Sequence, residues 1–582
     1  MAQAYMIRAA QLDLARQMET PAFIRQFIDF IAENGFNALL LYLEGRIRTP
    51  AFPYPSEDES YSAEVMRQIV AYASDKGVEV IPCISCLGHA EQYLQYPQMQ
   101  HLAEVRPGWK GRFGGMHQHA LCPSLEETKQ FLEAYLLDIA EIFPSTYFHV
   151  GLDEVFDLAC CPKCATQDYQ QEQKLYLQHI QFCHQLVTGK LGRQMMMWDD
   201  MFEFYPDILA QVPRDVIMVN WQYQTDVQQG QGHFLNLLRR DALAQYDKLG
   251  LRYLIAPWDA SVSNVLTFTR YASDHQPMVG IMTMWEKQRQ FIWRTLPAIA
   301  LAGRLWNDPA RVKDDASLFA KVVQDLAGSS DELLIKTWRA AADADLPVEL
   351  SIPIESEHEI RSFWSLPSSG LDYANAAAVS LIHAGLKATA SAVQTPTGKN
   401  ILADMKLVFA FHEVRFELDT LASQRWGAGR DIQQDDRLDA ALAKLAELRE
   451  LRHQHWQDWR GGIGPDHVTQ MYDQMIASLQ TLKQEAITPG ALRVRFCLPD
   501  KFSAPQCRIS LKYDAGWQVI TQGVYKGRVP GEGVYDCWFA IDPQREPAAA
   551  RVEIWGSGGQ GVCHLQVRTQ AGVQMPAEIT AR

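Results

Sequence analysis

The chain has 582 residues, more than a single hydrophobic core usually organises, so we expect two or three domains. Its 54 basic and 69 acidic residues give a formal net charge of −15, and no run of clustered lysine and arginine stands out. This balance argues against nucleic acid or an anionic membrane as the main partner.

Targeting signals and cysteine usage indicate the compartment. The opening stretch MAQAYMIRAAQLDLARQ has no basic region followed by a long apolar run, and no uninterrupted apolar run of about 18 residues occurs elsewhere. The 11 cysteines are an odd number scattered over the chain, unlike a secreted disulfide framework. We therefore expect a cytoplasmic protein with mostly reduced thiols and no membrane segment.

Short β-rich runs alternate with longer amphipathic runs through residues 1–315, which is typical of β-α units around a parallel sheet. The helical stretch at residues 21–35, for example, opens on Pro21 and closes on Gly35. The expected strands are residues 6–14, 37–44, 78–85, 147–154, 194–200, 216–222, 252–259 and 280–286. Eight such units predict an α/β fold, a (β/α)8 TIM barrel with its active site at the carboxyl ends of the strands.

The β-α rhythm stops after residue 315. A helical pattern follows, in which Leu438, Leu442, Leu445 and Leu448 share one helical face. Near the end of the chain, apolar and polar residues alternate between turn signals, as in a small antiparallel β-sandwich. We therefore predict a catalytic barrel over residues 1–315, a helical domain over residues 316–490 and a β-sandwich-like domain over residues 491–582.

Two adjacent carboxylates end the fourth expected strand, YFHVGLDE. Alternate residues of a strand share a face, so His149, Gly151 and Asp153 point one way, and Asp153 looks into the barrel mouth. Glu154 leans over the same space, and two charges so close keep a proton available for a leaving group. An ordinary two-carboxylate glycosidase holds its groups roughly 5 Å or more apart. Neighbours in one strand instead suit a mechanism in which the 2-acetamido oxygen of the substrate is the nucleophile.

The segment HVGLDEV resembles the His-x-Gly-x-Asp-Glu signature of family 20 glycoside hydrolases, the exo-β-N-acetylhexosaminidases. The resemblance implies that Asp153 orients the acetamido group while Glu154 acts as general acid. It also implies that Arg8, in IRAAQLDLAR, binds sugar hydroxyls. The segment PCISCLGHAE is similar to the family's third-strand motif, which implies that His89 lies beside the pair with Glu44 as its acidic partner.

Other strand ends extend the resemblance. MMWDDM is similar to the fifth-strand motif, and two further tryptophans match the family residues that wall the sugar pocket. The chain departs from the family where Glu286 directly follows Trp285, and where APWDASVS has no tyrosine, for which Tyr223 is the nearest substitute. The substrate-binding residues implied are Arg8, His149, Trp198, Asp199, Trp221, Tyr223, Trp258, Trp285 and Glu286.

The cysteine pairs CISC and CPKC have metal-ligand spacing, so a zinc site of four thiolates is conceivable at Cys83, Cys86, Cys161 and Cys164. Strand alternation, however, points Cys83 and Cys86 in different directions. We therefore expect the cysteines to shape the loop behind the carboxylates, and we expect neither a metal nor another cofactor.

The sequence thus predicts a retaining exo-β-N-acetylhexosaminidase that acts on glycans or glycoconjugates through an oxazolinium intermediate. The helical C-terminal part resembles the intracellular hexosaminidase D branch of the family. Two alternatives stay open: a catalytically silent glycan-binding protein, and a metal-dependent barrel hydrolase with His89, His149, Asp153 and Asp199 as ligands. The preference between GlcNAc and GalNAc, and a homodimer, are also left open.

Overall fold

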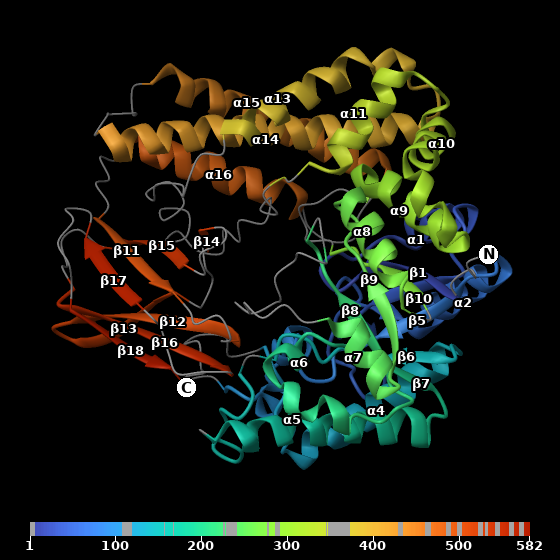
Figure 1. The fold of residues 1–582 in the computed structure, drawn as a ribbon, viewed down its shortest axis with the longest axis vertical. Helices are drawn as coiled ribbons and strands as arrows, with labels where there is room; N and C mark the ends of the chain where they lie inside the picture. The colour runs from blue at the N-terminus through green and yellow to red at the C-terminus, as the bar shows by residue number, and fades with distance from the viewer. Residues whose placement is uncertain are drawn as a thin grey trace.

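The computed structural model describes most of the chain. The described residues are 6–106, 119–155, 157–166, 168–224, 227, 241–275, 277, 279–285, 292–344, 346, 373–428, 435–459, 467–484, 490–497, 503–521, 528–529, 534–541, 547–557, 564–569 and 576–581. Three parts are seen in Figure 1: a barrel, a layer of long helices and a pair of sheets.

Eight parallel strands close into a barrel in the order β1-β10-β9-β8-β7-β6-β5-β2. They are β1 (Ile7–Asp13), β2 (Ala38–Tyr42), β5 (Glu79–Cys83), β6 (Tyr147–His149), β7 (Gln194–Trp198), β8 (Ile217–Trp221), β9 (Arg252–Ala256) and β10 (Val279–Met282). Each one overlaps a strand expected from the sequence, and this confirms the TIM barrel. The fourth strand is shorter than expected, because the backbone leaves the sheet after His149.

Helices cover the outside of the barrel (Figure 1). In the first of them, Thr20 accepts a hydrogen bond from the Phe23 N–H, Pro21 occupies the first turn, and Gly35 follows with φ 89°. The helices are α1 (Pro21–Glu33), α2 (Ala63–Asp75), α3 (Glu91–Leu94), α4 (Glu126–Ile142), α5 (Tyr169–His184), α6 (Met201–Phe204), α7 (Ala242–Leu249), α8 (Val262–Ala272) and α9 (Leu296–Asn307). Short segments complete the barrel loops: β3 (Ile47–Arg48), β4 (Tyr61–Ser62), η1 (Gln100–Leu102), η2 (Gln185–Lys190), η3 (Pro206–Gln211), η4 (Ile292–Thr295) and η5 (Pro309–Asp314).

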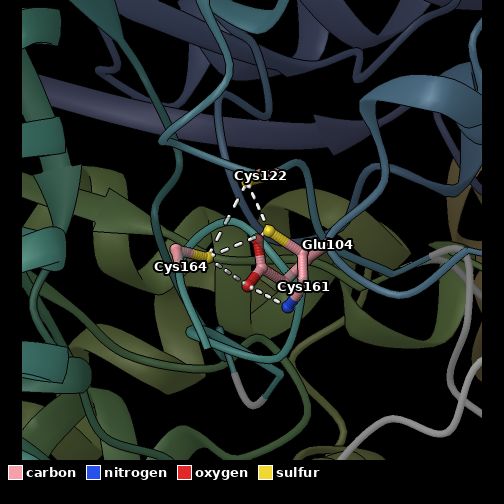
Figure 2. A group of neighbouring side chains, drawn as sticks. All are labelled: Glu104, Cys122, Cys161 and Cys164. Atoms are coloured by element: carbon pink, nitrogen blue, oxygen red, sulfur yellow. Dashed lines mark hydrogen bonds between the residues drawn. The ribbon is translucent and has the colours of Figure 1, made fainter. Parts of the chain in front are cut away.

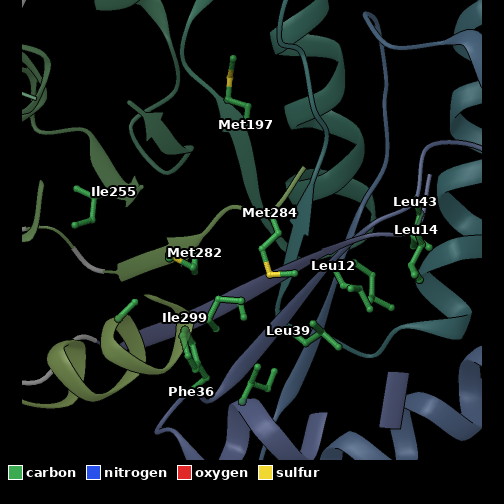
Figure 3. Close-up of a cluster of buried hydrophobic side chains, with 14 of the residues drawn as sticks. Leu12, Leu14, Phe36, Leu39, Leu43, Met197, Ile255, Met282, Met284 and Ile299 are labelled. Carbon is green, nitrogen blue, oxygen red and sulfur yellow. The ribbon is translucent and has the colours of Figure 1, made fainter. Parts of the chain in front are cut away.

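Strand alternation divides the barrel core into two clusters. Ala9, Leu40 and Val219 point inward with the other inner residues, while Leu12 and Leu39 point outward to the helices. Figure 3 shows part of the outer cluster, where side chains of β1 and β2 meet Phe36, which follows α1, and Ile299 of α9. The interior is packed with side chains, so chemistry is confined to the ends of the strands.

The helices after the barrel are α10 (Asp315–Ala327), α11 (Glu332–Ala342), α13 (Tyr373–Ala388), η6 (Ala390–Ala392), α14 (Pro396–Ala428), α15 (Asp436–Trp459) and α16 (His467–Gln484). The outer barrel cluster continues through them to Phe409, across the boundary expected at residue 315. A separate cluster joins α14, α15 and α16; it includes Leu438, Leu445 and Leu448, and Leu442 packs against it. Within the described part of the chain, no helix is long and apolar enough to cross a membrane.

The last strands form two four-stranded sheets, with orders β14-β15-β11-β17 and β13-β12-β16-β18. They are β11 (Gly490–Cys497), β12 (Ser503–Tyr513), β13 (Gly516–Thr521), β14 (Arg528–Val529), β15 (Val534–Ile541), β16 (Ala549–Ser557), β17 (His564–Thr569) and β18 (Ala577–Ala581). Most pairs are antiparallel, as expected, but β16 and β18 are parallel. The division of the chain into three domains stays a prediction.

Candidate active site

Asp153, Glu154 and His89 meet at the carboxyl ends of β5 and β6. One nitrogen of His89, Nε2, lies 3.3 Å from Oδ2 of Asp153 and 3.3 Å from Oε2 of Glu154. Oδ1 of Asp153 is buried and makes no hydrogen bond to any described residue. The two neighbouring carboxylates therefore share one cationic partner.

The backbone around the three side chains is strained. Glu44, His89, Leu152 and Glu154 have positive φ of 46°, 52°, 77° and 48°, a region that non-glycine residues rarely adopt. Such strained backbone persists only where the surrounding contacts hold it in place, and it is often found at functional sites. Gly88 packs closely against this backbone, because a Cβ at Gly88 would lie 2.3 Å from the Asp153 carbonyl oxygen.

Charge in the site is distributed unevenly. Burial by itself would lower the pKa of His89, but Asp153, Glu154 and Glu91 raise it well above its ordinary value. Burial would raise the pKa of Glu154, but the hydrogen bond from His89 and the positive charges of His89 and His119 lower it. Without a ligand, the proton between His89 and Glu154 is therefore held on the imidazole.

Two further contacts fix the backbone of Glu154. Nε2 of His119 donates to the Glu154 carbonyl oxygen at 3.1 Å, and Nδ1 of His119 pairs with Oε1 of Glu91 at 2.6 Å. The Glu154 N–H donates to Oδ2 of Asp200 at 2.9 Å, and Oδ1 of Asp200 accepts from Nε1 of Trp221 at 3.2 Å. Sequence reasoning missed His119 and Asp200 as contacts of Glu154, and Glu91 as the partner of His119, because the sequence alone does not show which loops meet.

Glu44 is buried near the same centre, at the end of β2. Burial raises its pKa to about 7, although the charges of Arg16 and His89 oppose the shift. Arg16 pairs with Asp13 at 3.2 Å, and its guanidinium carbon lies 5.2 Å from the ring centres of both Tyr42 and Trp285. A cation next to two aromatic rings is thus part of the site.

The expectation for Arg8 is wrong. It pairs with Gly280 near the start of β1, points away from the inner barrel cluster, and donates from Nε to the Gly35 carbonyl oxygen at 2.8 Å. Arg8 therefore lies at the amino end of the barrel, away from the carboxylates. Arg16, three residues beyond the end of β1, lies instead at the carboxyl end of the barrel, where the sites of this fold occur.

Five aromatic residues expected in the site lie together beside it. Nε1 of Trp285 donates to the Tyr223 hydroxyl at 2.6 Å, and the Tyr223 ring lies 4.8 Å from Trp221 and 5.9 Å from Trp258. These four are partly exposed. Trp198 is fully buried, 5.8 Å from Trp285, so it forms a floor beneath the others rather than a wall.

The remaining expected residues do not reach the centre. His149 is fully buried, 4.5 Å from Trp198, and its Nδ1 accepts the Gly151 N–H at 3.0 Å. Burial lowers the pKa of His149 to about 3, so its imidazole is neutral. Asp199 accepts hydrogen bonds from Asn220, at 2.6 Å, and from Tyr246. These two residues support the site from behind, and Glu286 lies outside the described residues.

The structure also tests the metal sets expected from the sequence. Among the described residues, the groups whose potential ligand atoms all lie within 4.8 Å are His89, Glu91 and His119, and Glu104, Cys122, Cys161 and Cys164. The set considered for a metal-dependent hydrolase is not one of them. The four-thiolate set is not one either: Cys83 contacts His149 inside the barrel, and Cys86 contacts the Ile84 carbonyl.

Part of the chain is similar to known proteins. Residues 5–235 match the model of the glycosyl hydrolase family 20 catalytic domain. This stretch holds the carboxylate pair, His89, Glu44 and Arg16, whereas Trp258, Trp285 and the strands β9 and β10 lie beyond it.

The chain is also similar to named proteins. Hexosaminidase D of Bos taurus is 27% identical over 235 residues, which are 38% of this chain and 64% of that protein. Beta-hexosaminidase of Vibrio furnissii is 25% identical over 246 residues, 37% of this chain and 39% of that protein. The chain thus spans less than two thirds of these relatives. The solved structure of a β-N-acetylhexosaminidase from Bacteroides fragilis is similar over a region that covers 55% of this chain and 71% of that protein. The two are 20% identical, with a TM-score of 0.42.

Proposed function

We propose that the chain is a retaining exo-β-N-acetylhexosaminidase, which releases a terminal β-linked N-acetylhexosamine by substrate-assisted catalysis. The observation that carries the proposal is the pairing of adjacent Asp153 and Glu154 on one nitrogen of His89, at 3.3 Å each. Neighbouring residues whose carboxylates meet one nitrogen lie on one side of the site, whereas an acid and a protein nucleophile flank the sugar ring from opposite sides. The nucleophile then comes from the substrate, and its 2-acetamido oxygen is suitably placed for that attack.

Asp153 holds the acetamido group in this mechanism. Its Oδ2 faces His89, and its Oδ1 makes no hydrogen bond within the described chain, so the carboxylate keeps acceptor capacity for the amide N–H. When the amide oxygen attacks the anomeric carbon, positive charge develops on the oxazolinium ring. A fixed carboxylate next to that charge stabilises the transition state more than the ground state.

Glu154 protonates the departing oxygen, and later deprotonates the water that opens the oxazolinium ring. The acid needs a proton that, without ligand, is held on His89, because the pKa of His89 is raised and that of Glu154 lowered. A sugar that displaces water from the site weakens charge separation between them, which favours transfer of the proton from Nε2 to Oε2. His89 is then the proton store, and His119 fixes the acid through its carbonyl.

The aromatic cluster supports recognition of one terminal sugar. Partly exposed Trp221, Trp258 and Trp285 offer apolar ring faces, and the Tyr223 hydroxyl, oriented by Trp285, is placed to meet the acetamido carbonyl. Arg16 supplies the cation for sugar hydroxyls. Because both hexosamines carry the acetamido group, paired aryl β-glycosides of GlcNAc and GalNAc are needed to establish the preference.

The deciding experiment replaces Asp153 with asparagine, which keeps the shape and removes the charge. We expect a large fall in kcat with a small change in KM, and tight inhibition of the wild type by a thiazoline analogue of the intermediate. The matched Glu154→Gln variant should lose roughly 10²–10⁴-fold on poor leaving groups and much less on activated aryl groups.

Four outcomes would contradict the proposal. A trapped sugar–carboxylate ester, or equal kcat/KM on substrates with a 2-hydroxyl, would show a protein nucleophile. Binding of N-acetylhexosamines without turnover of any aryl glycoside would favour the catalytically silent glycan-binding protein. Activity that is lost with chelators and restored at once by metal, with Asp153→Asn unaffected, would favour a metal-dependent hydrolase.

A further inference from the structure

A second cluster of reactive side chains lies behind the active site, and the proposed function does not use it. It consists of Glu104, Cys122, Cys161 and Cys164, which come from three segments and point at one another (Figure 2). Sγ of Cys161 lies 3.3 Å from Sγ of Cys122 and 3.2 Å from Sγ of Cys164, while Cys122 and Cys164 are 3.9 Å apart. All three thiols are free, and Glu104 is fully buried.

These distances fit ligands around one zinc ion. Four ligands at tetrahedral angles, with Zn–S bonds of about 2.3 Å, place the sulfurs about 3.8 Å apart. The observed separations of 3.2, 3.3 and 3.9 Å lie close to this value. They are far longer than a disulfide bond of about 2.05 Å, and three cysteines cannot all pair with one another.

Glu104 provides the observation that points to a cation. Its Oε1 accepts the N–H groups of Cys160, at 2.7 Å, and Cys161, at 3.0 Å, and lies 3.0 Å from Sγ of Cys164. Its Oε2 is buried and makes no hydrogen bond to any residue that the structure describes. A buried carboxylate oxygen without a partner is costly, and a bound metal ion would remove that cost.

We propose that Cys122, Cys161, Cys164 and one carboxylate oxygen of Glu104 bind a structural zinc ion. Thiolates select zinc over magnesium or calcium, and a carboxylate is an ordinary fourth ligand. Because the protein supplies all four ligands, no position is open for substrate or water, so the ion has a structural role. The site replaces the four-thiolate set expected from the sequence: Cys161 and Cys164 are kept, and Cys83 and Cys86 are not ligands.

The backbone is already arranged for such a site. Glu104 and Cys122 lie on two antiparallel segments, where the Glu104 N–H donates to Ala120 and the Cys122 N–H to Leu102, each at 2.8 Å. Cys161 and Cys164 lie in a tight turn, closed by the Cys164 N–H on the Cys161 carbonyl at 3.1 Å. Zinc would clamp this turn to the two segments.

The clamp would hold the general acid from two sides. Cys161 follows Glu154 by seven positions on the same loop, and Cys122 follows His119, whose Nε2 holds the Glu154 carbonyl oxygen at 3.1 Å. The loop that presents Glu154 and the segment that fixes it would therefore share one metal ion. Loss of zinc should loosen both.

The test measures metal in the intact protein. We expect the purified chain to retain about one zinc ion per molecule after dialysis against a weak chelator. Elemental mass spectrometry measures this zinc content. A mercurial thiol reagent should release this zinc to a colorimetric indicator. Cys122→Ser and Cys164→Ser should lose the metal, and Cys160→Ser, at the neighbouring cysteine outside the ligand set, should keep it.

A second readout separates this proposal from the proposed function. Cobalt substituted for zinc should show sulfur-to-cobalt charge transfer, whether or not the protein cleaves any glycoside. Removal of zinc should lower Tm, and added zinc should restore it. A wild type with no stoichiometric metal, stoichiometric iron instead of zinc, or a Cys122→Ser variant that keeps full zinc would each overturn the site. If the serine variants do not fold, the metal content and cobalt spectrum of the wild type still decide.

Discussion

Gly88 offers a direct test of how tightly the active site is held. It directly precedes His89, and a Cβ at this position would lie 2.3 Å from the Asp153 carbonyl oxygen and 3.3 Å from Cγ2 of Val155. The first contact is with backbone, which cannot rotate away as a side chain can. Gly88→Ala must therefore push the segment that carries Asp153 away from the segment that carries His89.

The size of the displacement sets the expected effect. An ordinary contact of a Cβ begins at 3.4 Å, so the two segments must separate by about 1 Å. A misplacement of about 1 Å in a catalytic constellation costs on the order of 10²-fold in rate. We expect kcat/KM to fall by about that factor, equivalent to roughly 3 kcal/mol of transition-state stabilisation.

The assay is kcat/KM on an aryl N-acetyl-β-hexosaminide, together with Tm for each variant. Gly189→Ala is the neutral control, because its Cβ would meet only Cγ of Gln185 at 3.8 Å. Gly280→Ala is the control for stability, because its Cβ would clash with Trp306 at 2.6 Å, away from the carboxylates. It should lower Tm with less loss of activity than Gly88→Ala. If Gly88→Ala kept kcat/KM within a small factor of the wild type, the close approach would not position the pair.

The other predictions concern the residues around the pair. Arg16→Met should raise KM by about tenfold to a hundredfold, the value of a lost charged hydrogen bond, whereas Arg8→Met should not; equal effects would contradict the corrected assignment. Trp285→Phe and Tyr223→Phe break the same 2.6 Å hydrogen bond, so their losses in kcat/KM should not add in the double variant, and full additivity would argue against coupling. Burial raises the pKa of Glu44 from 4.5 to about 7, so the folded protein keeps a proton that the unfolded chain releases, and the wild type loses stability as the pH rises through this window. In thermal melts, the Tm of Glu44→Gln minus the Tm of the wild type should therefore increase as the pH rises from 4.5 to about 7. A difference in Tm that does not change with pH would refute the raised pKa.

Much of the fold could be predicted because it depends on local patterns. The eight strands follow from β-rich runs at a regular spacing, and their inward and outward faces follow from alternation, as Leu39 and Leu40 show on β2. Domain boundaries were harder to predict than strands, because the outer barrel cluster continues to Phe409, well past the end of the β-α rhythm. Hydrophobic contact between distant segments leaves no periodic signal in either of them.

Some residues of the candidate site could likewise be predicted from the sequence, and others could not. The pair Asp153-Glu154, the nearby His89 and the tryptophans could be assigned from the sequence, because each ends a barrel strand and barrel geometry brings strand ends together. The prediction for Arg8 rested on a motif alone, whereas Arg8 lies near the start of β1, and Arg16 follows the carboxyl end of the same strand. His119 and Asp200 could not be assigned, because their contacts with Glu154 depend on how loops fold over the strand ends.

The sequence by itself determined the barrel, the carboxylate pair and the spacing of Cys161 and Cys164, since each of these is a matter of neighbouring residues and regular periods. Only the tertiary structure decided which partners these residues meet. It brought Glu104 and Cys122 to the cysteine turn from positions about 40 to 60 residues earlier, and it directed Cys83 and Cys86 elsewhere. The physical reason is that ligands and catalytic groups act across distances of 2 to 4 Å, and such contacts between loops are fixed by packing of the whole domain rather than by local sequence.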